Sequence, residues 1–172
     1  MFPEWLKPAV TELILNDVFF SQVFYALENL ESEIIPTAGT NGVKRFYNKE
    51  FMMQFPVSEQ VTIIKHEICH DIFEDMFLAG TRDKMIWNFA CDYKNNQLLD
   101  EEKNCPVPKS WLRDTKYDKM SKEQVYEELI KGAIKIPVSV LGQDVLSMEN
   151  DESSGEGEDG HDGKDGSTSG IS

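Results

Sequence analysis

The sequence His66-Glu67-Ile68-Cys69-His70 has the form HExxH, and it lies in a segment whose apolar spacing predicts a helix. Two histidines four residues apart share one face of a helix, so both imidazoles can reach one zinc ion. The intervening Glu67 is then placed to deprotonate a water held at the metal. The motif indicates half of a hydrolytic zinc site, which still needs a third protein ligand and an open fourth position.

The motif is predicted to lie on a long helix from about Glu59 to Leu78, with Ser58 as its N-cap. Apolar residues form one stripe along this segment, and the two histidines fall on a different face. Gly80 breaks the pattern, and a second helix is predicted from about Asp83 to Leu99. A second helix can return antiparallel to the first and bring a ligand to the histidines.

Three nearby carboxylates fit the third ligand position poorly. Glu74 lies two turns from His66, about 12 Å along the axis, which is too far for one coordination sphere. Asp71 points roughly 100° away from His70 around the helix. Asp83 is explained more simply as a residue at a helix start, where a negative charge is favourable.

Asp92 is the remaining candidate for the third ligand. Asn88, Asp92 and Asn96 recur at four-residue steps on the second helix, which places three short polar side chains in line on one face. The two asparagines are candidate hydrogen-bond partners for the aspartate. A buried carboxylate that bridges two helices is the competing interpretation of Asp92.

The N-terminal half is predicted to contain further helix and a small hairpin. Residues 5–30 carry apolar side chains at helical intervals, which indicates one or two helices. Residues 34–38 and 43–47 flank a turn that contains Asn41-Gly42, a strong hairpin signal. Two short antiparallel strands are therefore expected.

The C-terminal part is predicted to hold one more helix and then a polar tail. Ser121 to Gln124 has the form of a capping box, which opens a helix that Gly132 can end. Residues 134–146 are ambiguous between a strand and an extended arm. From Ser147 the sequence is rich in Gly, Ser, Asp and Glu, which predicts a disordered acidic tail or linker at 147–172 after a domain at 1–146.

The composition predicts a soluble, cytoplasmic protein. The chain of 172 residues is 40% hydrophobic, has a net charge of −14 and shows neither a secretory signal nor a run of about 20 apolar residues. An acidic chain disfavours nucleic acid and anionic membranes as partners, whereas the acidic tail could bind a protein partner. The three cysteines predict no disulfide, and Cys69 and Cys91 are expected to be small buried side chains.

A longer pattern includes the motif and resembles a known family. Its residues, in chain order, are Ile35-Pro36-Thr37-Ala38, Asn41-Gly42, Tyr47-Asn48, His66-Glu67-Ile68-Cys69-His70, Trp87-Asn88-Phe89-Ala90-Cys91-Asp92, Asn96, Leu98, Trp111-Leu112, Tyr117, Met120-Ser121 and Gln124-Val125-Tyr126. This order is similar to that of a family of bacterial and phage metallopeptidases. Members join an N-terminal zincin-like domain to a von Willebrand A-like domain, and the acidic stretch resembles the linker between the two.

The resemblance implies an α+β fold of the minimal zincin type, mostly helical, with a short antiparallel hairpin beside the HExxH helix. It supports Asp92 as third ligand, and it suggests that the strand of Tyr47 pairs at its edge with an extended peptide. The function predicted is a zinc metallopeptidase with one Zn²⁺ bound by His66, His70 and Asp92, Glu67 as general base and a protein or peptide substrate. Tyr47, Tyr93 and Tyr117 are unranked candidates for stabilising the oxyanion.

Two alternatives belong to other classes of protein. A catalytically inactive, zinc-stabilised binding or regulatory module would hold its metal with four protein ligands, whereas a catalytic site has three and a water. A metal-free helical interaction domain would bind no zinc.

Overall fold

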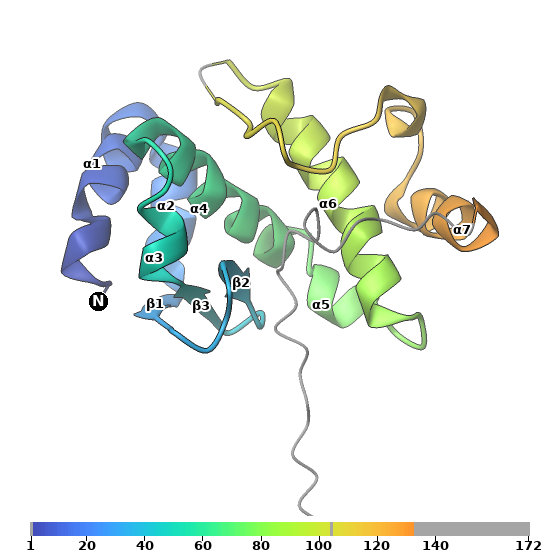
Figure 1. The fold of residues 1–172 in the computed structure, drawn as a ribbon, viewed down its shortest axis with the longest axis horizontal. Coiled ribbons are helices and arrows are strands. Elements are labelled where there is room, and N and C mark those ends of the chain that lie inside the picture. Colours follow the sequence, from blue (N-terminus) through green and yellow to red (C-terminus); the bar gives the residue numbers. More distant parts are fainter. Residues whose placement is uncertain (1, 104, 133–172) are drawn as a thin grey trace, which may run out of the picture.

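The computed structural model describes residues 2–103 and 105–132, which form an α+β fold (Figure 1). The elements in chain order are η1 (Glu4–Leu6), α1 (Lys7–Asn16), α2 (Val18–Ala26), β1 (Glu28–Glu31), β2 (Ala38–Thr40), β3 (Lys44–Tyr47), α3 (Lys49–Met52), α4 (Val57–Ile72), α5 (Asp75–Leu78), α6 (Lys84–Asp100), η2 (Thr115–Tyr117) and α7 (Lys122–Gly132). The expected strand or arm at 134–146, the tail at 147–172 and the domain boundary between them lie outside the described residues.

The N-terminal segment contains two helices, as predicted, and also a strand that was not predicted. Asp17 ends α1 and caps α2, where its Oδ1 accepts a hydrogen bond from the backbone N–H of Phe20 at 3.0 Å. Residues 28–31 then form β1. Helical spacing of apolar residues continues to Leu30, so nothing in the local pattern marks the change to a strand.

The predicted hairpin is present as β2 and β3, which pair antiparallel. Asn41 Oδ1 accepts hydrogen bonds from the backbone N–H groups of Val43 and Lys44, and Gly42 supplies the positive φ of 79° that the turn requires. The first strand begins at Ala38, four residues later than expected, and Ile34 is almost fully exposed.

The sheet is mixed, with the strand order β1-β3-β2, because β1 pairs parallel to β3. The strand of Tyr47 is therefore central, with a neighbour on each side, and the expectation that it pairs at its edge with a peptide was wrong. β2 is the edge strand that contacts α4.

The motif helix is shorter than predicted and has a different start. α4 begins at Val57 with Pro56 as its N-cap, so Ser58 is the second helical residue and not the cap. It ends at Ile72, because Glu74 adopts a left-handed conformation with φ 54° and starts the separate helix α5. The predicted continuous helix to Leu78 is thus two helices with a sharp break.

The other two predicted helices are confirmed. Asp83 caps α6 by accepting a hydrogen bond from the backbone N–H of Ile86 at 3.0 Å. The capping box of α7 is present: the Ser121 N–H donates to Gln124 Oε1 at 2.9 Å, and the Gln124 N–H donates to Ser121 Oγ at 3.3 Å.

The helix α4 is the centre of the molecule and lies between two hydrophobic cores. It contacts α1, α2 and β2 on one side and α5 and α6 on the other (Figure 1). The first core includes Leu6, Leu13, Phe24, Ile64 and Ile68, and the second includes Trp87, Phe89, Cys91, Tyr117 and Val125. Because both sides are covered, α4 is buried from Thr62 through His70, on the histidine face as well as the apolar stripe.

Arg45 joins the sheet to α4 and α2 in the first core. Its side chain is fully buried, forms an ion pair with Asp71 and donates to the carbonyl oxygens of Val23 and Phe24 at 3.1 Å. Thr40 Oγ1 donates to the other Asp71 oxygen at 2.6 Å. These contacts hold the C-terminal end of α4 against the sheet.

Arg45→Met is expected to lower the free energy of unfolding by about 3–5 kcal/mol, because it leaves the largely buried Asp71 carboxylate without its balancing charge and removes one donor from each of two carbonyl groups. Urea denaturation measures the loss. Arg113→Met is the matched control, since its partners Asp100 and Asp118 are partly exposed and such pairs contribute about 1 kcal/mol or less. Equal losses in the two variants would contradict this account.

None of the helices in the described part of the chain combines the length and apolar character needed to cross a membrane.

Candidate metal centre

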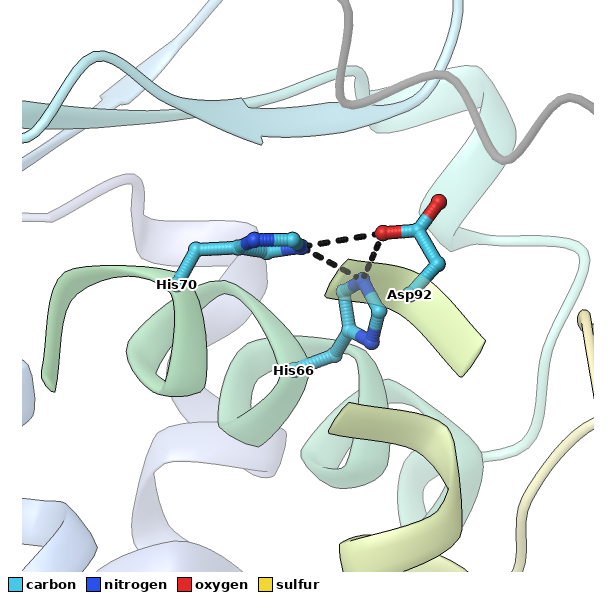
Figure 2. A group of neighbouring side chains, drawn as sticks. All are labelled: His66, His70 and Asp92. Carbon is cyan, nitrogen blue, oxygen red and sulfur yellow. Dashed lines mark hydrogen bonds and ion pairs between the residues drawn. The ribbon is translucent and has the colours of Figure 1, made fainter. Parts of the chain in front are cut away.

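The three predicted ligands meet between α4 and α6 (Figure 2). The Nε2 atoms of His66 and His70 are 3.0 Å apart. Asp92 Oδ1 lies 3.2 Å from His70 Nε2 and 3.5 Å from His66 Nε2. All three side chains are buried, with at most 5% of each residue exposed. Three potential metal-binding atoms therefore converge on one point.

This geometry fits a zinc ion. Tetrahedral zinc at about 2.0–2.1 Å from its ligands holds the ligand atoms roughly 3.3 Å apart, close to the three separations in this site. Asp92 Oδ1 accepts no hydrogen bond from the described residues although it is buried, whereas Oδ2 accepts one from Asn88 Nδ2 at 3.2 Å. A buried carboxylate oxygen is costly without a partner, and a cation between it and the two imidazoles would supply one.

Asp75 orients His70 by binding the ring nitrogen that faces away from Asp92. His70 Nδ1 lies 3.0 Å from Asp75 Oδ2. A carboxylate only accepts hydrogen bonds, so Asp75 favours the tautomer of the neutral imidazole with its proton on Nδ1, which directs the lone pair of Nε2 toward the point where a metal ion would lie. A carboxylate that binds the second nitrogen of a metal-ligating histidine is a common arrangement, because it fixes the tautomer and the ring orientation.

Asp75 is itself held by several groups from other elements. Lys122 Nζ donates to its two oxygens at 2.6 and 2.7 Å, and Asn95 Nδ2 donates to Oδ2 at 3.1 Å. Trp87 Nε1 donates to its backbone carbonyl at 2.8 Å. Burial raises the pKa of the Asp75 carboxyl, but the hydrogen bond from His70 and the charge and hydrogen bonds of Lys122 outweigh it and hold this pKa at about 2.

His66 is positioned by an aromatic contact. Its ring packs edge-on against Trp111, with ring centroids 4.7 Å apart. Asn96 Nδ2 donates to the Leu112 carbonyl at 3.0 Å and so holds this loop against α6. Of the two asparagines expected beside the aspartate, Asn88 binds Asp92 directly, and Asn96 binds the loop that carries Trp111.

Glu67 is buried one residue after the first histidine, with 1% of its surface exposed. It lies close enough to Tyr47 to affect that phenol: burial raises the pKa of Tyr47, and the negative charges of Glu67 and Asp71 raise it further. The Tyr47 hydroxyl donates to Asn29 Oδ1 at 3.2 Å inside the core. Glu67 thus faces a dry environment, where electrostatic interactions are stronger than in water.

The three tyrosines differ in their surroundings. Tyr47 is fully buried in the first core, and Tyr117 is buried in the second, where its ring packs edge-on against Tyr93 with centroids 4.7 Å apart. Tyr93 is only half-buried and directly follows Asp92. Tyr93 is therefore the most exposed of the three tyrosines, and the role of each in stabilising an oxyanion stays a prediction.

The structure places the other carboxylates that were considered away from the three ligand atoms. Asp71 binds Arg45 and Thr40, Asp83 caps α6, and Glu74 is exposed at the break after α4. The cysteines Cys69, Cys91 and Cys105 are free and buried, as expected. Burial raises the pKa of the Cys69 thiol to about 12, which makes it a packing residue with little thiolate.

Asp75 and Lys122 were not singled out from the sequence, and Trp111 was noted only as part of the family pattern, without a role at the site. Asp75 is five residues after His70, so on the predicted continuous helix it would lie off the histidine face. The left-handed residue Glu74 turns the chain and brings it back. Lys122 and Trp111 belong to distant segments, and no local pattern links either of them to α4.

The comparison with known families agrees with the motif. A family model described as "Putative metallopeptidase domain" matches residues 1–170. The chain belongs to this family. No curated protein and no solved structure matches it. The residues matched by this metallopeptidase-domain family include both the HExxH sequence and the later Trp-Asn-x-Ala-x-Asp sequence, and the group of His66, His70 and Asp92 could hold a metal ion.

Proposed function

We propose that this protein is a zinc-dependent metallopeptidase that binds one Zn²⁺ through His66, His70 and Asp92. The observation that carries the proposal is the convergence of two imidazole nitrogens and one carboxylate oxygen, all within 4.8 Å of one another. In the described part of the chain this group contains three ligands, which is the number found in catalytic zinc sites, whereas structural sites have four. The family match supports the same class of reaction.

Zinc bound there would lower the pKa of a water molecule and polarise the substrate carbonyl. The chain would supply the proton transfers. Glu67 follows His66 on the buried side of α4, where its carboxylate would accept a proton from the attacking water and pass it to the nitrogen of the leaving amine. Asp75 would keep His70 in the tautomer that ligates through Nε2.

β2 is the strand at which we propose that an extended peptide aligns. It is an edge strand and contacts the motif helix α4, so a peptide added there would pass beside the ligand group. Main-chain hydrogen bonds to β2 would hold the peptide independently of its side chains. This assignment replaces the strand of Tyr47, which has neighbours on both sides.

A zinc-stabilised binding module without activity is the second candidate, and one observation favours it. The ligands come from two helices: α4 packs in the first hydrophobic core, whereas α6 provides most of its buried apolar residues to the second and only Leu99 to the first. A metal between the helices would therefore cross-link the two parts of the fold. Both candidates require the same ligands. They differ in whether the loaded protein cleaves peptides.

Metal removal and restoration test the proposed function directly. Purified protein is expected to contain one zinc ion per chain, as measured by elemental mass spectrometry. It is also expected to cleave peptides of a quenched-fluorescence library. Dialysis against a chelator should abolish cleavage, and one equivalent of zinc should restore it. A protein that binds zinc but cleaves nothing would leave the binding module as the function, and a protein that binds no zinc would contradict both candidates.

Zinc is also expected to stabilise the fold, because it binds the native arrangement of α4 and α6. At a free zinc concentration 1,000 times the Kd, the free energy of unfolding should rise by about 4 kcal/mol. Urea denaturation with and without zinc measures this difference. A magnesium control at the same concentration should have no effect, since a site with two imidazoles does not suit magnesium.

A further inference from the structure

Lys122, on helix α7, binds Asp75, the carboxylate that contacts the candidate ligand His70. It lies 47 residues after Asp75 in the chain, yet its ammonium group donates to both Asp75 carboxylate oxygens at 2.6 and 2.7 Å. The Asp75 side chain is 2% exposed and the Lys122 side chain 16%. The ion pair is therefore largely shielded from water, and each charged group is the main neutralising partner of the other.

The contact continues from Asp75 to the metal ligand. Asp75 Oδ2 accepts from Lys122 and also binds His70 Nδ1 at 3.0 Å, so one oxygen joins the lysine to the imidazole. Phe73, which directly follows α4, lies beneath the ammonium group, 4.3 Å from it to the ring centroid. Lys122 is thus held against both the end of the motif helix and the carboxylate that orients its second histidine.

We propose that Lys122 is a positioning residue for the metal centre: it fixes the Asp75 carboxylate in the orientation that binds His70 Nδ1, so that Nε2 of the same ring is directed at the metal. The inference rests on the proposed zinc site and extends it to a third helix. Without the ammonium group, the buried carboxylate loses two hydrogen bonds and its balancing charge. It can then rotate away from His70, which releases the imidazole from a single tautomer.

The tautomer of His70 tests this role in the zinc-free full-length protein. Long-range nitrogen–proton NMR spectra of the imidazoles report which ring nitrogen carries the proton, and the chain has only three histidines. In wild type the His70 proton is expected mainly on Nδ1, because the anchored Asp75 carboxylate holds it there against the second acceptor, Asp92 Oδ1, which lies 3.2 Å from Nε2. In Lys122→Met it is expected to be shared between the two nitrogens, and an unchanged His70 tautomer would overturn the inference.

Zinc affinity is the second measurement, by competition with a coloured chelator. Lys122→Met should raise the Kd for zinc about 10-fold or more, the range for losing an outer partner of a metal ligand. Lys122→Arg should restore the affinity, because a guanidinium group can also bind both oxygens of one carboxylate. Lys131→Met, on the same helix, removes a lysine whose ion-pair partner among the described residues is the exposed Glu128, and it should behave as wild type.

The controls separate positioning from general stability. Arg113→Met removes an ion-pairing cation that does not contact the ligand group, and its zinc affinity should stay at the wild-type value. If Lys122→Met does not fold, Lys122→Gln, which keeps a donor without the charge, takes its place in both measurements. Wild-type affinity in a folded Lys122 variant would overturn the inference while leaving the zinc site intact. A wild type that binds no zinc would instead overturn the proposed function.

Discussion

Glu67→Gln is expected to keep one zinc per chain and to lower the rate of peptide cleavage by about 10²- to 10⁴-fold. Glutamine has nearly the same shape as glutamate, so the buried position in α4 stays filled, but an amide cannot accept the proton of the attacking water. The group proposed to hold the metal is His66, His70 and Asp92, which this substitution leaves unchanged, so the zinc content should stay the same. Cleavage of the peptide library and zinc analysis on the same samples measure both quantities.

Glu74→Gln is the matched control for Glu67→Gln. Glu74 lies just after the same helix and is exposed. Its replacement by glutamine is the same chemical change, at a position outside the ligand group. It should cleave peptides at the wild-type rate. If Glu67→Gln and wild type cleave equally fast, Glu67 is not the general base and the catalytic proposal fails, whatever the zinc content.

Asp92→Ala is expected to weaken zinc binding by more than the roughly 10- to 100-fold that follows loss of an outer hydrogen-bond partner, because it removes a ligand and its negative charge. The two histidines, both on α4, would be the remaining members of the group. After dialysis the variant should contain little zinc, and a competition titration should give the new Kd. Peptide cleavage should fall with the zinc content.

Asp83→Ala is the control for Asp92→Ala on the same helix. Asp83 caps α6 through its bond to the Ile86 N–H, so its loss should cost about 1 kcal/mol of stability. Its zinc affinity should equal that of wild type. Equal zinc content in wild type and Asp92→Ala would remove Asp92 from the ligand group and leave two histidines with an unidentified partner.

Much of the candidate site follows from local spacing. The i and i+4 positions of the histidines place both imidazoles on one side of α4 in any helix, and Asn88 and Asp92 are joined by the same spacing on α6. The Asn41-Gly42 turn and the capping box at Ser121 are also local, because each is made by hydrogen bonds within a few residues. These features were predicted correctly because neighbours in the sequence satisfy them.

Features that depend on distant contacts were missed. β1 pairs with β3 through residues about 16 positions apart, and its own segment continues the helical spacing of α2. The end of α4 was placed too late, because Glu74 adopts a left-handed conformation that is usually taken by glycine or asparagine. Tertiary packing stabilises that conformation, and a glutamate at this position gives no sequence signal for the end of the helix.

The sequence by itself determined that two histidines and a glutamate share one helix. It also left Asp92 as the remaining candidate for the third ligand among the carboxylates nearby. The 3.2 Å distance between Asp92 Oδ1 and His70 Nε2 is evident only in the tertiary structure, because it depends on how α4 and α6 pack in the two hydrophobic cores. The tertiary structure also brought Asp75 to the second nitrogen of His70, and Lys122 to Asp75. Helical periodicity fixes which residues share a face, whereas the partner of that face is chosen by long-range packing.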